Sequence, residues 1–160
     1  MSFSPVVPVP ASHDHPQPMQ AAAMFLLRLG LAFVFVRFGV QKIVDWHGWA
    51  ILVPAAFTEV LTDATGFGDV GLLRMLGYVE VLVGVHLALG LWTRAAAAVA
   101  AIVLLGAVAM MGTSGIGTRD VGLLGAAIAI AAQGAGRYSL DARLQQVRTL
   151  RAREASCPCS

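Results

Sequence analysis

Long apolar segments alternate with shorter polar ones along this chain. Four segments consist mainly of apolar residues, namely residues 21–40, 72–92, 95–112 and 121–136. A helix needs about 20 such residues to cross the hydrocarbon layer of a membrane, which is about 30 Å thick. The fourth segment is largely Gly and Ala, and such small residues let helices approach closely in lipid. The pattern therefore predicts an all-α, integral membrane four-helix bundle.

The longest connection between these spans, residues 41–71, is too long to be a simple turn. Trp46 and Trp49 near its start are typical of an anchor at the membrane interface. Residues 51–61 contain enough apolar side chains to lie on the outer surface as a short helix that starts around Pro54. We interpret the connection either as a surface lid or as a substrate-binding loop.

The two chain ends are predicted to lie outside the transmembrane domain, which we place at residues 21–138. Residues 1–20 are rich in proline and lack Lys and Arg, so we expect a disordered tail and not a signal peptide. Residues 139–160 are expected to form a basic tail. The leucines and arginines of residues 137–154 predict an amphipathic helix that holds anionic lipid headgroups.

The composition excludes a soluble enzyme. Apolar residues make up 58% of the 160 residues and charged residues 12%, whereas ordinary soluble domains have about 25% charged residues. The net charge is +2, and no stripe of Lys and Arg indicates binding to nucleic acid. The two cysteines, Cys157 and Cys159, lie at the chain end and cannot staple the fold; we interpret them as incidental and not as a thiol or metal handle.

The distribution of Lys and Arg predicts the orientation, because cytoplasmic flanks carry the excess of positive charge. An even number of spans places both termini on one side of the membrane. The residues expected on that side are Arg94, Arg137, Arg143, Arg148, Arg151 and Arg153, against Lys42, Arg74 and Arg119 on the other. We therefore expect a multi-pass protein of the inner (plasma) membrane with both termini in the cytoplasm.

Ionisable residues inside the spans are the candidates for function, because a charge in lipid costs at least about 2.5 kcal/mol unless it is paired or hydrated. Gly77, Glu80 and Gly84 share one helix face at spacings of three and four, so the carboxylate should face another helix. Arg28 and Lys42 are the inward cations of the first span, and either could meet Glu80. The pair is interpreted as a structural ion pair, with a proton relay or a ligand site as the alternatives.

Two further polar residues lie within the spans. Arg37 is turned away from Arg28 and is expected to reach the outer headgroups. His86 lies away from the Glu80 face and is expected to be a hydrogen-bonded interior imidazole, because no second ligand stands at a spacing usable for metal or haem. No metal site is predicted, and no nucleotide, haem or zinc-protease motif occurs in the chain.

The chain resembles the DoxX family of small bacterial and archaeal membrane proteins over about residues 24–144. The resemblance rests on three motifs, RLGLAFVFVRFGVQKIVD, GYVEVLVGVHLALGLWTRAAA and RDVGLLGAAIAIAAQGAGRYSLDARL. The motif positions are Arg28, Gly39, Lys42, Glu80, Gly90, Thr93, Arg94, Gly136, Arg137, Tyr138, Ser139, Leu140 and Asp141.

This resemblance implies a four-helix fold and a link to redox chemistry. Some members resemble membrane subunits of thiosulfate:quinone oxidoreductase, and others are partners in oxidative-stress complexes. The implied function is therefore the membrane subunit of a quinone-linked oxidoreductase or of a redox-stress complex, with a quinone as the possible cofactor and an oxidoreductase subunit as partner. The alternative is a non-catalytic membrane module that scaffolds partners, including further copies of itself, or passes a small solute.

Overall fold

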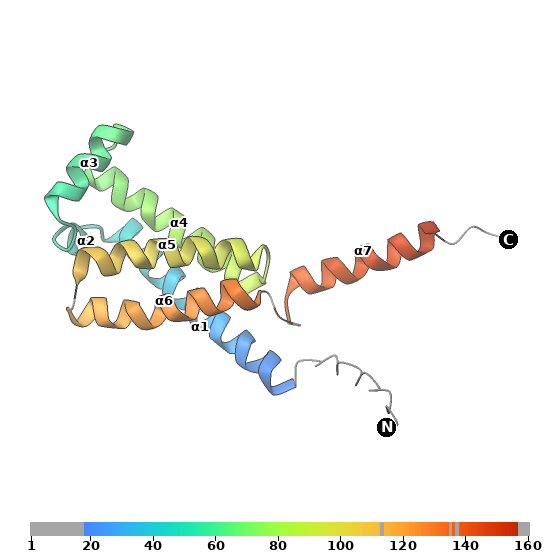
Figure 1. Cartoon of the computed structure of the whole chain (residues 1–160). Coiled ribbons are helices and arrows are strands. Elements are labelled where there is room, and N and C mark those ends of the chain that lie inside the picture. Colours follow the sequence, from blue (N-terminus) through green and yellow to red (C-terminus); the bar gives the residue numbers. More distant parts are fainter. Residues whose placement is uncertain (1–17, 113, 135, 137, 157–160) are drawn as a thin grey trace, which may run out of the picture.

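The computed structural model describes residues 18–112, 114–134, 136 and 138–156, and every regular element in these ranges is a helix (Figure 1). Four helices, α1, α4, α5 and α6, are long and apolar enough to cross a membrane, which confirms the predicted fold class. The elements are α1 (Pro18–Val44), α2 (His47–Ala50), α3 (Ala55–Thr65), α4 (Asp69–Leu89), α5 (Thr93–Met111), α6 (Gly115–Gln133) and α7 (Leu140–Ser156).

The ends of the spanning helices differ from the sequence prediction by a few residues, and local chemistry explains the differences. Helix α4 ends at Leu89 because Gly90 adopts the left-handed conformation, with φ of 69°. Helix α6 begins at Gly115, six residues before the predicted start, because the Ser114 hydroxyl accepts a hydrogen bond from the Gly117 amide at 3.3 Å and caps the helix. The last residues of the predicted N-terminal tail already belong to α1.

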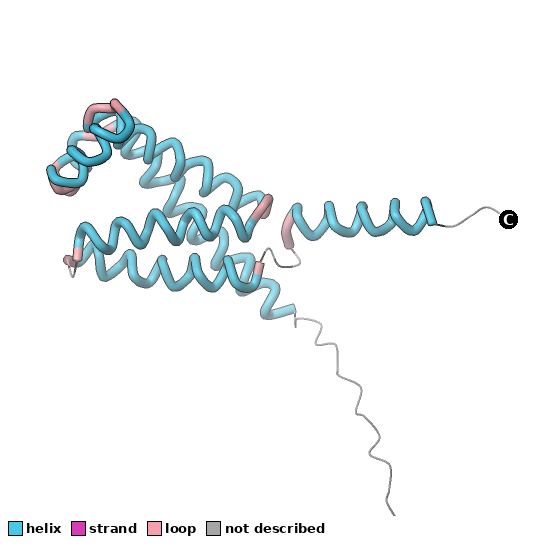
Figure 2. The backbone as a smooth tube through the Cα atoms, turned by 45° about the horizontal axis from the view of Figure 1, so that its top comes forward, coloured by secondary structure: helices cyan, strands magenta, loops and turns pink. Residues whose placement is uncertain are grey.

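The four spanning helices form two pairs, α1 with α4 and α5 with α6, and these pairs contact each other less extensively than their members do. Figures 1 and 2 both show α5 and α6 side by side. Glycines bring α1 and α4 together: a Cβ atom added to Gly39 would lie 2.7 Å from the Gly77 carbonyl oxygen. One added to Gly84 would lie 2.9 Å from the Ala32 carbonyl oxygen. The small-residue face predicted for α4 is therefore its contact with α1.

The hydrophobic core occupies the half of the bundle nearer the chain ends. It joins residues from all four spanning helices, including Leu31, Leu87, Ala97 and Ile130, none of which is more than 2% exposed. Because the helices are antiparallel, the other half contains the end of α1, the start of α4, the end of α5 and the start of α6. The two helix pairs enclose a cavity there.

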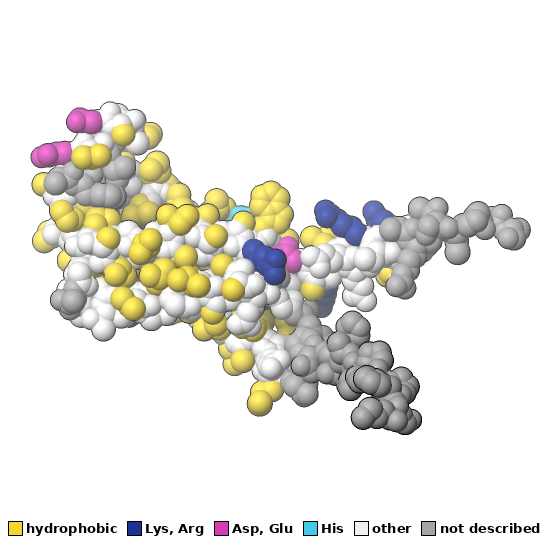
Figure 3. Space-filling view, in the orientation of Figure 1, with side chains coloured by type: hydrophobic (Ala, Val, Ile, Leu, Met, Phe, Trp, Pro, Cys, Tyr) yellow, Lys and Arg dark blue, Asp and Glu magenta, His cyan; other side chains and the backbone are white. Residues whose placement is uncertain are grey.

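Apolar side chains also cover much of the outside of the bundle, as the space-filling view shows over α5 and α6 (Figure 3). Phe33, Leu82, Ile102 and Ile128 are all more than half exposed. Contact between so much apolar surface and water would be unfavourable, whereas lipid chains solvate such a surface. Arg37 is exposed on α1, on the side away from Arg28, as predicted.

The connection between α1 and α4 contains two short helices at the end of the bundle opposite the chain ends (Figure 1). The predicted surface helix at residues 51–61 is α3, which begins at Ala55 directly after Pro54. The basic tail forms α7, which extends away from the bundle in both views. Whether lipid headgroups bind α7 stays a prediction. The predicted disorder of residues 1–17, and Arg137, Cys157 and Cys159, lie outside the described residues.

Candidate functional site

The cavity between the helix pairs has a volume of about 410 Å³ and is lined mainly by apolar side chains. Residues of α1, α4, α5 and α6 form its walls, and Trp49 of α2 and Thr58 of α3 line it from the connection between α1 and α4. The charged residues that line it are Lys42, Glu80, Arg119 and Asp120. Its size and its few polar groups are typical of a site for a lipophilic small molecule.

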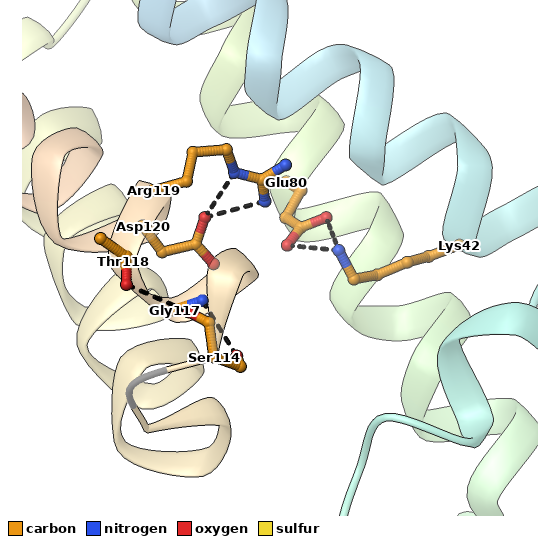
Figure 4. Close-up of polar contacts among 7 residues, drawn as sticks. All are labelled: Lys42, Glu80, Ser114, Gly117, Thr118, Arg119 and Asp120. Carbon is orange, nitrogen blue, oxygen red and sulfur yellow. Dashed lines mark hydrogen bonds and ion pairs between the residues drawn. The ribbon is translucent and has the colours of Figure 1, made fainter.

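Lys42 of α1 and Glu80 of α4 form a buried ion pair on the cavity wall (Figure 4). The ammonium group donates to both carboxylate oxygens, at 2.9 Å to Oε1 and 2.7 Å to Oε2. The two residues are only 6% and 7% exposed. The ammonium nitrogen also lies 3.8 Å from the centre of the Trp49 ring, which adds a cation–π contact. The pair therefore neutralises both charges and holds α1, α4 and α2 together.

The sequence left Arg28 and Lys42 as alternative partners of Glu80. The partner in the structure is Lys42. Arg28 lies 14 residues earlier in α1, about 20 Å away along the helix axis. Its Nη2 donates to the Tyr138 carbonyl oxygen at 2.6 Å, at the other end of the bundle. Whether Arg28, Lys42 or Glu80 binds a ligand stays a prediction.

A second ion pair, Arg119 with Asp120, lines the same cavity from α6. Nε and Nη2 of Arg119 donate to Oδ1 of Asp120 at 3.0 and 2.8 Å. The guanidinium carbon also lies 4.6 Å from the centre of the Phe38 ring, so Arg119 connects α6 to α1 across the gap between the helix pairs. Sequence reasoning missed this pair, because it began the fourth span at residue 121 and assigned Arg119 to the flank. Two adjacent opposite charges before a Gly/Ala-rich helix were the available signal.

Several motif residues meet at the opposite end of the bundle, in a group that we call the chain-end cluster: Arg28, Gly90, Thr93, Gly136, Ser139 and Asp141. The carboxylate of Asp141 accepts from the amides of Trp92 and Thr93, both at 3.0 Å, and from the Thr93 hydroxyl at 3.2 Å. These amides are at the start of α5, so Asp141 caps that helix from a distant part of the chain. The Asp141 amide in turn donates to the Gly90 carbonyl oxygen at 3.1 Å.

Positive φ angles explain both glycines of this cluster, and close packing also explains Gly90. A Cβ atom on Gly90 would lie 2.7 Å from Cβ of Ser139 and 2.8 Å from Nη1 of Arg28. Gly136 adopts φ of 67°, and the Ser139 hydroxyl donates to its carbonyl oxygen at 2.9 Å. Arg94 lies against Gly134, since a Cβ atom added to Gly134 would lie 2.9 Å from Nε of Arg94. The chain-end cluster joins the start of α7 to the turn between α4 and α5, so its role is structural.

His86 belongs to neither polar group. Its Nδ1 lies 2.8 Å from the Leu82 carbonyl oxygen, one turn earlier in α4, and the residue is only partly buried. The imidazole is hydrogen-bonded and only partly buried, and its place in a buried polar network stays a prediction. No group of His, Cys, Asp and Glu able to hold a metal ion occurs in the part of the chain that the structure describes.

The comparison with protein families decides the identity of this bundle. The DoxX family model matches residues 23–113, more than half of the chain. The chain belongs to the DoxX family. The match covers α1 to α5 of this DoxX protein, including Lys42 and Glu80, and ends before Arg119 and Asp120 of α6. Comparisons with curated proteins and with solved structures give no match.

Proposed function

We propose that this DoxX protein binds a quinone in the cavity between its helix pairs and serves as the membrane subunit of a quinone-linked oxidoreductase. The observation that carries the proposal is the cavity itself, which combines apolar walls with two ion pairs. Apolar walls suit an isoprenoid tail, and charged groups suit the oxygen atoms of a quinone ring. A redox subunit of the complex would supply or accept the electrons.

The position of the cavity favours ligand binding over solute passage. The half of the bundle beyond it is filled by the core, where Leu87, Ala97, Ala127 and Ile130 are 0% exposed. A solute would have to open this packing to cross the membrane. A scaffold function needs no cavity at all, so it becomes the conclusion if the cavity binds nothing.

The test is the quinone content of the protein and its effect on electron transfer. We expect quinone to co-purify when the protein is extracted in mild detergent without added lipid. Gly106→Leu should abolish this binding, because Gly106 lines the cavity and a Cβ atom there has open space around it. Gly125→Leu is the matched control, since Gly125 also has open space but lies outside the cavity lining. Quinone-linked dehydrogenase rates are then compared in membranes with and without each form.

Two results would replace this proposal with the scaffold or solute-passage function. One is the absence of quinone from the purified wild-type protein. The other is a set of quinone-linked rates that do not change when the chain is deleted. If Gly125→Leu loses quinone as completely as Gly106→Leu, the cavity is not the binding site.

The proposed orientation places both termini in the cytoplasm and the cavity end toward the outside. It rests on the excess of Lys and Arg at the chain-end side. We expect a membrane-impermeant maleimide to leave Cys157 and Cys159 unlabelled in intact cells and to label them after the inner membrane is opened. A Ser replacement of both cysteines controls for background. Strong labelling in intact cells would reverse the orientation.

A further inference from the structure

The two ion pairs at the cavity differ in how much hydrogen-bonding capacity they keep. In the Lys42–Glu80 pair, the ammonium group bonds to both carboxylate oxygens and lies over the Trp49 ring. An ammonium group has three N–H donors, so two are used by Glu80 and the third faces an aromatic ring. The ammonium group of this pair therefore has little left to offer a ligand.

The Arg119–Asp120 pair is bonded on one side only. Both hydrogen bonds from Arg119 end on Oδ1 of Asp120. Among the described residues, no hydrogen bond is made by Nη1 of Arg119 or by Oδ2 of Asp120. Asp120 is only 5% exposed, and a carboxylate in that position normally has its acceptors satisfied. The pair therefore presents one charged donor and one charged acceptor at the cavity.

The surroundings of this pair place it where a ligand head would sit. Figure 4 shows the Arg119 guanidinium extending from α6 toward the Glu80 carboxylate of α4. The same group stacks on Phe38 of α1, so it lies at the boundary between the helix pairs. The uncharged residues that line the cavity are mainly apolar, which suits a tail.

We infer that Arg119 and Asp120 are the head-group contacts of the cavity, whereas Lys42 and Glu80 shape its wall. This inference rests on the proposed function and names the residues that recognise the ligand. A ring carbonyl oxygen accepts from Nη1 of Arg119, and a ring hydroxyl donates to Oδ2 of Asp120. The oxidised quinone has only acceptors and depends on Arg119, whereas the reduced quinol also uses Asp120.

The test measures the affinity for both redox forms of a benzoquinone with a ten-carbon alkyl tail. Quenching of Trp49 reports binding of the quinone, in a protein with Trp46→Phe and Trp92→Phe, because Trp49 lines the cavity. The quinol affinity is measured by competition under argon. We expect Arg119→Gln to weaken the quinone about tenfold or more, and Asp120→Asn to weaken the quinol more than the quinone.

Matched variants separate recognition from folding. Arg37→Gln and Asp63→Asn remove exposed charges outside the cavity lining and should leave both affinities unchanged. Arg119→Lys keeps the charge but lacks the second terminal nitrogen, so it should also lower the affinity for the quinone. It replaces Arg119→Gln as the test variant if Arg119→Gln does not fold.

The failures are distinguishable. A wild-type protein that binds neither redox form overturns the proposed function, and this inference with it. A wild-type protein that binds both forms, while the Arg119 and Asp120 variants bind like the two controls, overturns this inference alone. An equal loss of both forms in every Arg119 and Asp120 variant also contradicts it, because a structural pair would not distinguish quinone from quinol.

Discussion

Lys42→Met is expected to lower the free energy of unfolding by about 3 to 5 kcal/mol, the range found when one member of a buried ion pair is removed. The substitution keeps an unbranched side chain of similar length, so packing against Trp49 changes little. It leaves the Glu80 carboxylate, which is 7% exposed, without the ammonium group that satisfies both of its oxygens. The free energy is measured by unfolding in mixed micelles with increasing amounts of denaturing detergent.

A double-mutant cycle makes this prediction specific to the pair. Lys42→Met combined with Glu80→Met removes both charges, and we expect most of the lost stability to return, because apolar replacements of whole buried pairs are often neutral. Arg37→Met is the control, since it removes an exposed charge from the same helix. A double variant as unstable as Lys42→Met alone would show that the ion pair is not what stabilises this part of the bundle.

The Lys42–Glu80 pair could be predicted from the sequence only in part. The cost of a charge in lipid indicates that Glu80 needs a partner, and the glycines beside it indicate which face it occupies. The choice between Arg28 and Lys42 depends on how far α1 and α4 are shifted along each other. That shift is set by the contact of Gly39 with Gly77 and by the ends of both helices, which no local pattern gives.

Arg119 and Asp120 were not predicted as part of the cavity for a related reason. A charged residue usually marks the end of an apolar span, and two in succession strengthen that interpretation. Here each neutralises the other inside α6, so the helix continues past them toward its cap at Ser114. The contacts of the chain-end cluster could not be read from a local pattern either. The motif resemblance singled out Asp141, but its hydrogen bonds to Trp92 and Thr93 join residues 49 and 48 positions apart.

Gly39→Ala is expected to destabilise the bundle by about 1 to 3 kcal/mol, the usual cost of overpacking. The added Cβ atom would lie 2.7 Å from the Gly77 carbonyl oxygen and 2.9 Å from the Val81 amide nitrogen. Both atoms belong to the backbone of α4 and cannot rotate away, so α1 and α4 must separate. The Lys42–Glu80 pair lies within one turn of this contact, and its hydrogen bonds should lengthen as the helices move apart.

Gly30→Ala provides a control of opposite sign in the same helix. No atom lies within 4 Å of a Cβ atom at Gly30, which is exposed on α1. Alanine favours a helix over glycine by about 1 kcal/mol, so Gly30→Ala should leave stability unchanged or raise it slightly, whereas Gly39→Ala should lower it. Unfolding in mixed micelles measures both variants, and quinone content reports whether the cavity survives. Equal effects of the two substitutions would mean that α1 and α4 do not meet at Gly39, and the ion pair beside that contact would then need another explanation.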